Sequence, residues 1–107
     1  SYRMKWAADY VREKDWPSAA TLWKEEYEKG WGRAVYRSAM NLVLYYEQMD
    51  EPASALEWCK WALKKRRRQL VGPSPREREQ LEAWRQALEK RLLELDRLKD
   101  YNRKSVN

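Results

Sequence analysis

The stretch AMNLVLYYEQMDEPASALEWCKWA, residues 39–62, decides the fold of this chain. Its first half carries an apolar stripe at the spacing of an α-helix, made of Ala39, Leu42, Val43 and Tyr46. Its second half carries another, made of Ala55, Trp58, Cys59 and Ala62 and continued by Leu63. Between them, Met49-Asp50-Glu51-Pro52 introduces a proline, which is tolerated in the first turn of a helix but not in its interior. The stretch therefore predicts two helices joined by a tight turn.

The same pattern occurs once more, earlier in the chain. A shift of 35 residues pairs five identical residues in the same order: Tyr10 with Tyr45, Asp15 with Asp50, Pro17 with Pro52, Ala20 with Ala55 and Trp23 with Trp58. The first copy has its own stripes, formed by Met4, Ala7, Ala8 and Val11 and then by Ala20, Trp23 and Tyr27. A period near 34 residues is typical of stacked helix hairpins. We expect Ala20 and Ala55 to lie where the paired helices touch, with a tryptophan filling the space one turn later.

The last third of the chain predicts one long helix. Ser74-Pro75-Arg76-Glu77 is a capping box with proline at the first helical position. We expect the helix over 74–103 and a frayed tail over 104–107. Its apolar stripe consists of Leu81, Trp84, Leu88, Leu92, Leu95 and Leu98.

This helix has two possible roles. A stack of two hairpins leaves an apolar end exposed, so we expect the helix to cap that end. The alternative is weak self-association of two copies as a coiled coil through Leu92, Leu95 and Leu98. Among the tryptophans, Trp23, Trp58 and Trp84 are expected in the core and Trp61 is expected as an exposed anchor.

The composition excludes much of the known catalytic chemistry. The 107 residues contain no histidine, which removes Ser-His-Asp and Cys-His systems and His-based zinc sites. The single cysteine, Cys59, lies in an apolar run and is expected to be a small buried side chain, with a reactive thiol as the alternative. Neither common glycine-rich nucleotide motif occurs. We therefore expect a non-catalytic, all-α domain without a cofactor or a metal.

The positive charge of the chain is concentrated in its last part. Residues 1–63 hold 9 Lys+Arg and 10 Asp+Glu, whereas residues 64–107 hold 14 and 7. The run Lys64, Lys65, Arg66, Arg67 and Arg68 could neutralise phosphates of nucleic acid or of an anionic surface. It is short, it follows a predicted helix whose C-terminus itself favours cations, and no known nucleic-acid fold accompanies it. We therefore interpret it as solvated surface and keep an anionic partner as the alternative.

The stripes of both copies resemble the tetratricopeptide repeat. The second copy matches through Leu42, Val43, Tyr46, Ala55, Trp58 or Cys59, and Ala62, and the first through Ala7, Ala8, Ala20 and Trp23, with Tyr27 where the family prefers alanine. The resemblance spans about residues 3–64 and implies a right-handed α–α superhelix that binds a peptide or protein in its concave face. It implies repeats at 1–31 and 32–70, followed by the long capping helix.

The resemblance also implies which residues line the groove. The family's inner positions correspond to Tyr2, Lys5, Asp9 and Arg12 in the first copy and to Arg37, Met40, Asn41, Leu44 and Gln48 in the second. Lys5 and Asn41 match the subclass that clamps a peptide carboxylate, but Asp9 stands where an asparagine is expected. A third basic repeat is absent. We therefore expect sequence-tolerant binding of a protein or peptide rather than carboxylate clamping.

A second, narrower likeness concerns the cellular location. Leu56-Glu57-Trp58, within an alanine-rich helix pair that precedes a long charged helix, is similar to the C-terminal helical domains of bacterial envelope lipoproteins. This likeness implies a periplasm-facing domain that meets the membrane only through an upstream lipid anchor. The chain begins at Ser1 without Met, so we expect it to be part of a larger protein.

Overall fold

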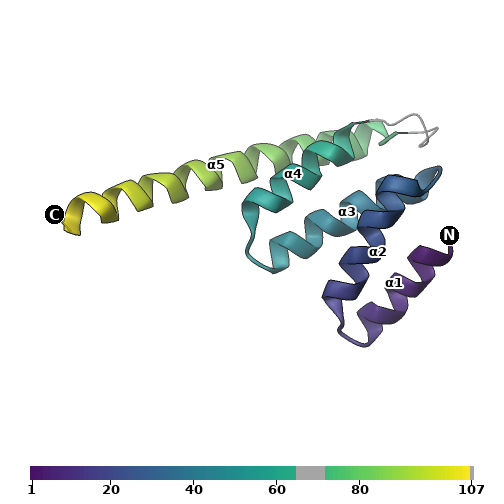
Figure 1. Cartoon of the computed structure of the whole chain (residues 1–107). Coiled ribbons are helices and arrows are strands. Elements are labelled where there is room, and N and C mark those ends of the chain that lie inside the picture. The colour runs from purple at the N-terminus through teal and green to yellow at the C-terminus, as the bar shows by residue number, and fades with distance from the viewer. Residues whose placement is uncertain (65–71, 107) are drawn as a thin grey trace.

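The computed structural model describes residues 1–64 and 72–106 and contains five α-helices in these two ranges (Figure 1). They are α1 (Tyr2–Arg12), α2 (Trp16–Lys29), α3 (Arg33–Gln48), α4 (Pro52–Leu63) and α5 (Pro75–Val106). No strand occurs in either range. The predicted all-α fold, ending in a long helix, is therefore confirmed.

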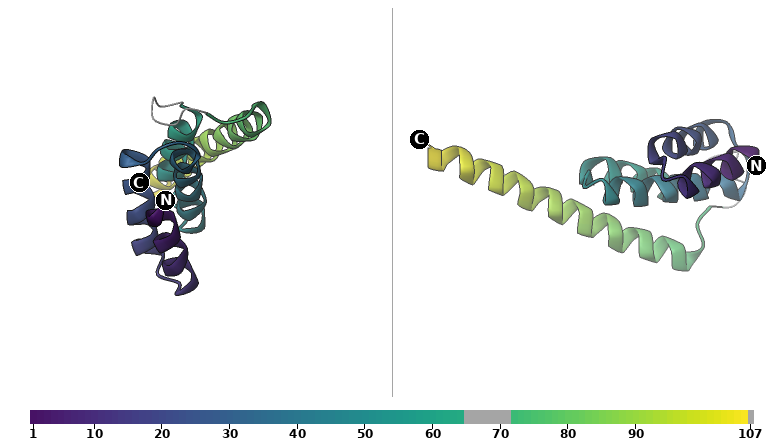
Figure 2. Two further views of the ribbon diagram at one scale, coloured as in Figure 1. Left: turned by 90° about the vertical axis from the view of Figure 1, so that its right-hand side faces the viewer. Right: turned by 90° about the horizontal axis from the view of Figure 1, so that it is seen from below.

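The helices stack in the order of the chain. α1 and α2 form one hairpin, α3 and α4 form a second, α2 packs against α3, and α5 packs against α4. Two ion pairs show that α5 also runs alongside α3. Arg33, at the start of α3, pairs with Glu77, and Arg91 pairs with Asp50, just past the end of α3. Figures 1 and 2 show that α5 extends well beyond the stack, so its C-terminal half leaves the body of the molecule.

Two clusters of buried side chains hold the stack together. The first joins α1, α2 and α3 through Ala7, Ala19, Ala20, Trp23 and Leu42. The second joins α2, α3, α4 and α5 through Tyr27, Val35, Tyr36, Ala39, Val43, Ala55, Cys59, Ala62, Leu81 and Leu88. Trp58 packs against both clusters and meets Tyr27 edge-on, with ring centroids 5.3 Å apart. The burial of Leu81 and Leu88 shows that the first half of α5 covers the second hairpin, as expected of a cap.

The turns inside the two hairpins have the same backbone geometry. One residue in each takes a left-handed conformation, Lys14 with φ of 61° and Asp50 with φ of 56°. The amide of the next residue then donates to the carbonyl oxygen five positions back, Asp15 to Tyr10 at 2.8 Å and Glu51 to Tyr46 at 2.9 Å. Each pair of equivalent residues is 36 positions apart. The structural repeat is therefore one residue longer than the shift that aligns identical residues.

This offset changes which residues correspond in the two hairpins. By the shift of 36, Ala55 corresponds to Ala19 rather than to Ala20, and Trp58 corresponds to Leu22 rather than to Trp23. The residue pairing inferred from sequence identity is therefore corrected by one position. The expectation that Ala20 and Ala55 are buried is confirmed, with exposed fractions of 4% and 0%.

Local sequence explains where α5 begins and ends. The amide of Glu77 donates to Ser74 Oγ at 3.2 Å, and the amide of Ser74 donates to Glu77 Oε1 at 2.9 Å, which is the predicted capping box. Hydrogen bonds from Arg33 and Ser74 lower the pKa of Glu77 to about 2. At the other end the helix continues to Val106, so the predicted end at 103 is wrong and residues 104–106 are helical rather than frayed. Arg103 and Lys104 lie in this last turn, where cations interact favourably with the helix dipole.

The burial of Ala55 leads to a first stability prediction. We expect Ala55→Leu to lower the free energy of unfolding by about 1–3 kcal/mol, because added methylenes must displace close-packed neighbours. Ala20→Leu should behave in the same way, whereas Ala53→Leu, at an exposed position of α4, serves as the matched control. Thermal unfolding followed by circular dichroism measures the difference. Unchanged midpoints in both core variants would contradict the packing described above.

Candidate interaction surface

α3 presents one exposed stripe on the side opposite its buried residues. Five residues predicted to line a groove lie along this stripe at spacings of one helical turn: Arg37, Met40, Asn41, Leu44 and Gln48. Met40 and Asn41 are half-buried, and Leu44 is 49% exposed. The stripe therefore combines one exposed apolar side chain with the exposed polar side chains of Arg37 and Gln48.

The four predicted residues of α1 are spaced three or four positions apart and share one side of that helix, where Asp9 and Arg12 form an ion pair. By the shift of 36, Lys5 corresponds to Asn41 and Arg12 to Gln48, so both belong on the same side of the stack as the α3 stripe. We call these seven residues the inner stripe: Lys5, Arg12, Arg37, Met40, Asn41, Leu44 and Gln48. Tyr2 and Asp9 correspond to Ser38 and Tyr45, which border the α3 stripe on its less exposed edge. Tyr2 and Asp9 therefore lie at the edge of the inner stripe, and Asp9 also faces the neighbouring side of α1.

That neighbouring side of α1 forms a groove with α2, which was not predicted from the sequence. Its volume is about 770 Å³, and its walls are formed by Trp6, Asp9, Tyr10, Glu13, Ser18, Thr21 and Leu22. We call it the open-end groove, because it lies at the end of the stack opposite α5. Trp6 is 53% exposed and its ring packs edge-on against that of Tyr2, with centroids 4.8 Å apart. The sequence held one signal for it, because aromatic residues recur at Tyr2, Trp6 and Tyr10 outside the apolar stripe of α1.

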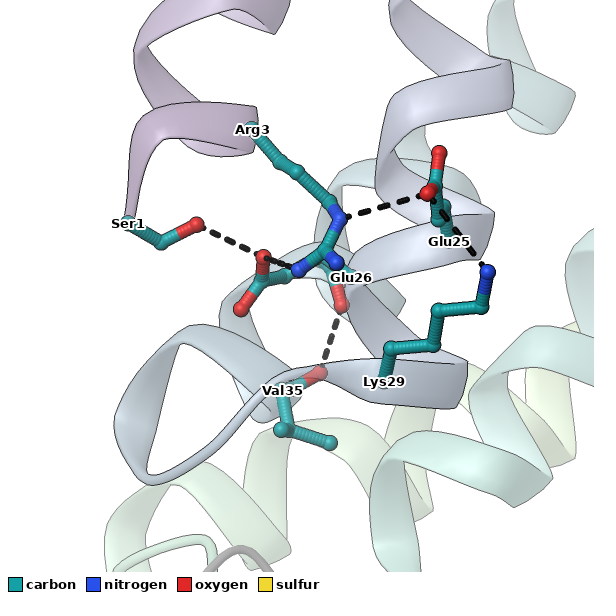
Figure 3. A network of polar contacts seen from close by, with 7 residues as sticks. Ser1, Arg3, Glu25, Glu26, Lys29 and Val35 are labelled. Carbon is teal, nitrogen blue, oxygen red and sulfur yellow. Dashed lines mark hydrogen bonds and ion pairs between the residues drawn. The ribbon is translucent and has the colours of Figure 1, made fainter.

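A buried ion pair fixes α1 against the end of α2. Glu26 is 1% exposed and accepts hydrogen bonds from Ser1 Oγ at 2.6 Å and from Arg3 Nη1 at 3.2 Å. Figure 3 shows that Ser1 and Arg3 reach this carboxylate from α1, while Arg3 Nε lies 3.5 Å from Glu25. Gly30 leaves room for the carboxylate, since a Cβ at Gly30 would lie 2.0 Å from Glu26 Oε2. This polar contact sets the position of α1, and with it the walls of the open-end groove.

The end of α4 holds the described part of the basic run. Trp61, the expected exposed anchor, is 37% exposed, and the Lys64 ammonium lies 5.3 Å above its ring. Lys64 itself is exposed. The remaining cations of the run, Lys65, Arg66, Arg67 and Arg68, lie outside the described residues.

The lone thiol is placed in the core. Cys59 is buried, its Sγ lies 3.4 Å from the carbonyl oxygen of Leu81, and burial raises the pKa of the thiol to about 11. This confirms the interpretation of Cys59 as a small buried side chain. Within the described ranges, no three His, Cys, Asp or Glu side chains are gathered to hold a metal ion. No helix in these ranges is long and apolar enough to cross a membrane.

The comparisons with known proteins identify a family. A family model described as a domain of unknown function (DUF6340) matches residues 5–90. No curated protein and no solved structure matches the chain. The matched range covers both hairpins and ends just past Leu88, the last buried residue of α5. Because it spans most of the chain, the chain belongs to this family.

Proposed function

We propose that this family member is a non-catalytic protein-interaction module that presents its inner stripe to a peptide or protein partner. The observation that supports the proposal most directly is the alignment of exposed Arg37, Leu44 and Gln48 along one side of α3, opposite its buried residues. The stripe combines an apolar contact with cations and amides, which can hydrogen-bond to a peptide backbone or to carboxylates. Its resemblance to the inner face of tetratricopeptide repeats points to the same role.

The dimensions of α3 suit a short extended peptide. Its 16 residues span about 24 Å at the rise of an α-helix. An extended chain covers that length with about seven residues. The stripe is held by packed helices rather than by loops, so binding requires little ordering of the module itself.

Selection from a peptide library displayed on phage tests this function. We expect enriched peptides to lose at least tenfold in affinity for Leu44→Asp, and for Lys5→Ala combined with Arg37→Ala, at low and at high salt. Lys60→Ala, at an exposed position of α4, is the matched control and should leave affinity unchanged. Fluorescence anisotropy measures each dissociation constant. Equal affinities for the stripe variants and the control would contradict the proposal.

The alternative partner is an anionic surface bound through the run 64–68. Its support is the charge of residues 64–107 and the exposure of Lys64. If the inner stripe is the binding site, neutralising all five cations changes affinity only through long-range steering, which salt screens. Loss of all binding on neutralising the run, with the stripe variants unaffected, would favour the anionic partner, as would a steep loss of affinity with rising salt.

A further inference from the structure

The open-end groove has a counterpart in the second hairpin. By the shift of 36, its residues Trp6, Asp9, Tyr10 and Leu22 correspond to Leu42, Tyr45, Tyr46 and Trp58. Leu42 is buried in the first cluster with residues of the first hairpin, and the partly buried Tyr45, Tyr46 and Trp58 pack against that cluster. Leu42 is 0% exposed where Trp6 is 53% exposed. The apolar part of the groove is therefore a surface that the fold covers one repeat later, whereas Met49 and Glu57, the counterparts of Glu13 and Thr21, stay exposed.

The helix that covers the counterpart surface is α2. It packs against α3, and Ala19, Ala20 and Trp23 are its buried residues in the cluster that contains Leu42. Its Lys24 places an ammonium 5.4 Å from the ring centroid of Tyr46, which corresponds to Tyr10 of the groove. The features of α2 that fit this type of surface are therefore two small residues, one aromatic residue and one cation. They are Ala19, Ala20, Trp23 and Lys24.

The charge of the open-end groove indicates which charge its partner carries. Among the described residues of its walls, Asp9 and Glu13 are the charged ones, and both are carboxylates. Their counterparts in the second hairpin are the uncharged Tyr45 and Met49. Asp9 pairs with Arg12, but both are exposed, so this ion pair is weak and can be exchanged. Two copies facing each other through this groove would set like charges together, which disfavours a symmetric dimer.

We propose that the open-end groove binds a basic amphipathic helix of another protein, seated on α1 as α2 is seated on α3. Its apolar face packs on Trp6 and Tyr10, and its lysine or arginine side chains reach the Tyr10 ring, Asp9 and Glu13. The site adjoins the inner stripe where Asp9 pairs with Arg12, but Trp6 and Tyr10 belong to the groove and Leu44 to the stripe, so variants of these three residues let the two proposals fail independently.

The probe is a stapled helical peptide with the sequence of residues 15–30 in which Glu25, Glu26 and Glu28 are replaced by lysine. The comparison peptide instead has Lys24 and Lys29 replaced by glutamate. We expect the basic peptide to bind the intact chain at least tenfold more tightly than the acidic one. Trp6→Ser with Tyr10→Ser should weaken its binding at least tenfold, whereas Trp31→Ser, at another exposed tryptophan, should not.

Two further variants separate this site from its alternatives. Asp9→Asn with Glu13→Gln should remove most of the preference for the basic peptide, while Leu44→Asp in the inner stripe should leave it unchanged. Circular dichroism verifies that each variant is folded, and fluorescence anisotropy measures binding. Equal binding of both peptides, or full binding to the Trp6 and Tyr10 variant, would overturn the proposal. A dimer in sedimentation that Trp6→Ser dissociates would overturn it too, because a second copy would then occupy the groove.

Discussion

A chain shortened to residues 1–73 is expected to lose its cooperative fold and to aggregate. Leu81 and Leu88 of α5 are almost completely buried in the cluster that contains Cys59 and Ala62, and Trp84 packs against it. The burial of two leucines contributes about 3–6 kcal/mol, which is a large part of the 5–15 kcal/mol that stabilises a typical domain. Their removal would also expose a continuous apolar face of α4 to water.

The matched control removes only the part of α5 that leaves the stack. A chain that stops after Leu92 retains the buried leucines and the Arg91–Asp50 ion pair, and it lacks Leu93, Leu98 and Tyr101, which are all exposed. We expect it to unfold at nearly the temperature of the full chain. Size-exclusion chromatography, dye binding and circular dichroism compare the three lengths. A soluble, cooperatively folding monomer of residues 1–73 would show that α5 is an independent arm and would favour the coiled-coil alternative.

The hairpins could be predicted from the sequence because their signals are local. Apolar stripes such as Leu42, Val43 and Tyr46 fix one face of a helix, and prolines at Pro17 and Pro52 fix where the next helix begins. The capping box at Ser74 located the start of α5 in the same way. Each of these signals depends on residues within a few positions of one another.

The alignment of the two hairpins could not be predicted, because sequence identity and backbone geometry differ by one residue. One position along a helix turns the side chain by about 100°, so this small offset moves a residue to another face. The offset likewise moves Tyr2 and Asp9 from the middle of the inner stripe to its edge, because the family positions were carried over without the turn geometry. Lys5 and Arg12 remain on the inner stripe when the hairpins are aligned by the shift of 36.

The Arg3–Glu26 contact had no signal in the sequence. Its two charges occupy the positions of Ala39 and Ala62 in the second hairpin, where an apolar pattern predicts small core residues. Charged residues in a helix are ordinarily expected on its solvated face. Only the approach of α1 to the end of α2, across 23 positions of sequence, pairs them.

Trp23→Ala is expected to cost more stability than Trp58→Ala. Trp23 is 6% exposed and lies in the cluster that joins the two hairpins, with Ala7 of α1 and Leu42 of α3. Its removal leaves a cavity that packed helices cannot close, which costs about 3–5 kcal/mol. Trp58 is only partly buried, so less of its side chain leaves water on folding, and its removal should cost about 2 kcal/mol.

The comparison decides between the two alignments of the hairpins. Alignment by identity makes Trp23 and Trp58 equivalent and predicts similar losses. Alignment by the turns makes Trp23 equivalent to Cys59, which is fully buried, and Trp58 equivalent to Leu22, which is half-buried. Urea unfolding of both variants measures the free energies, with Trp31→Ala as an exposed control. Equal losses would mean that Trp58 is held as firmly as Trp23, which would contradict its equivalence to the half-buried Leu22.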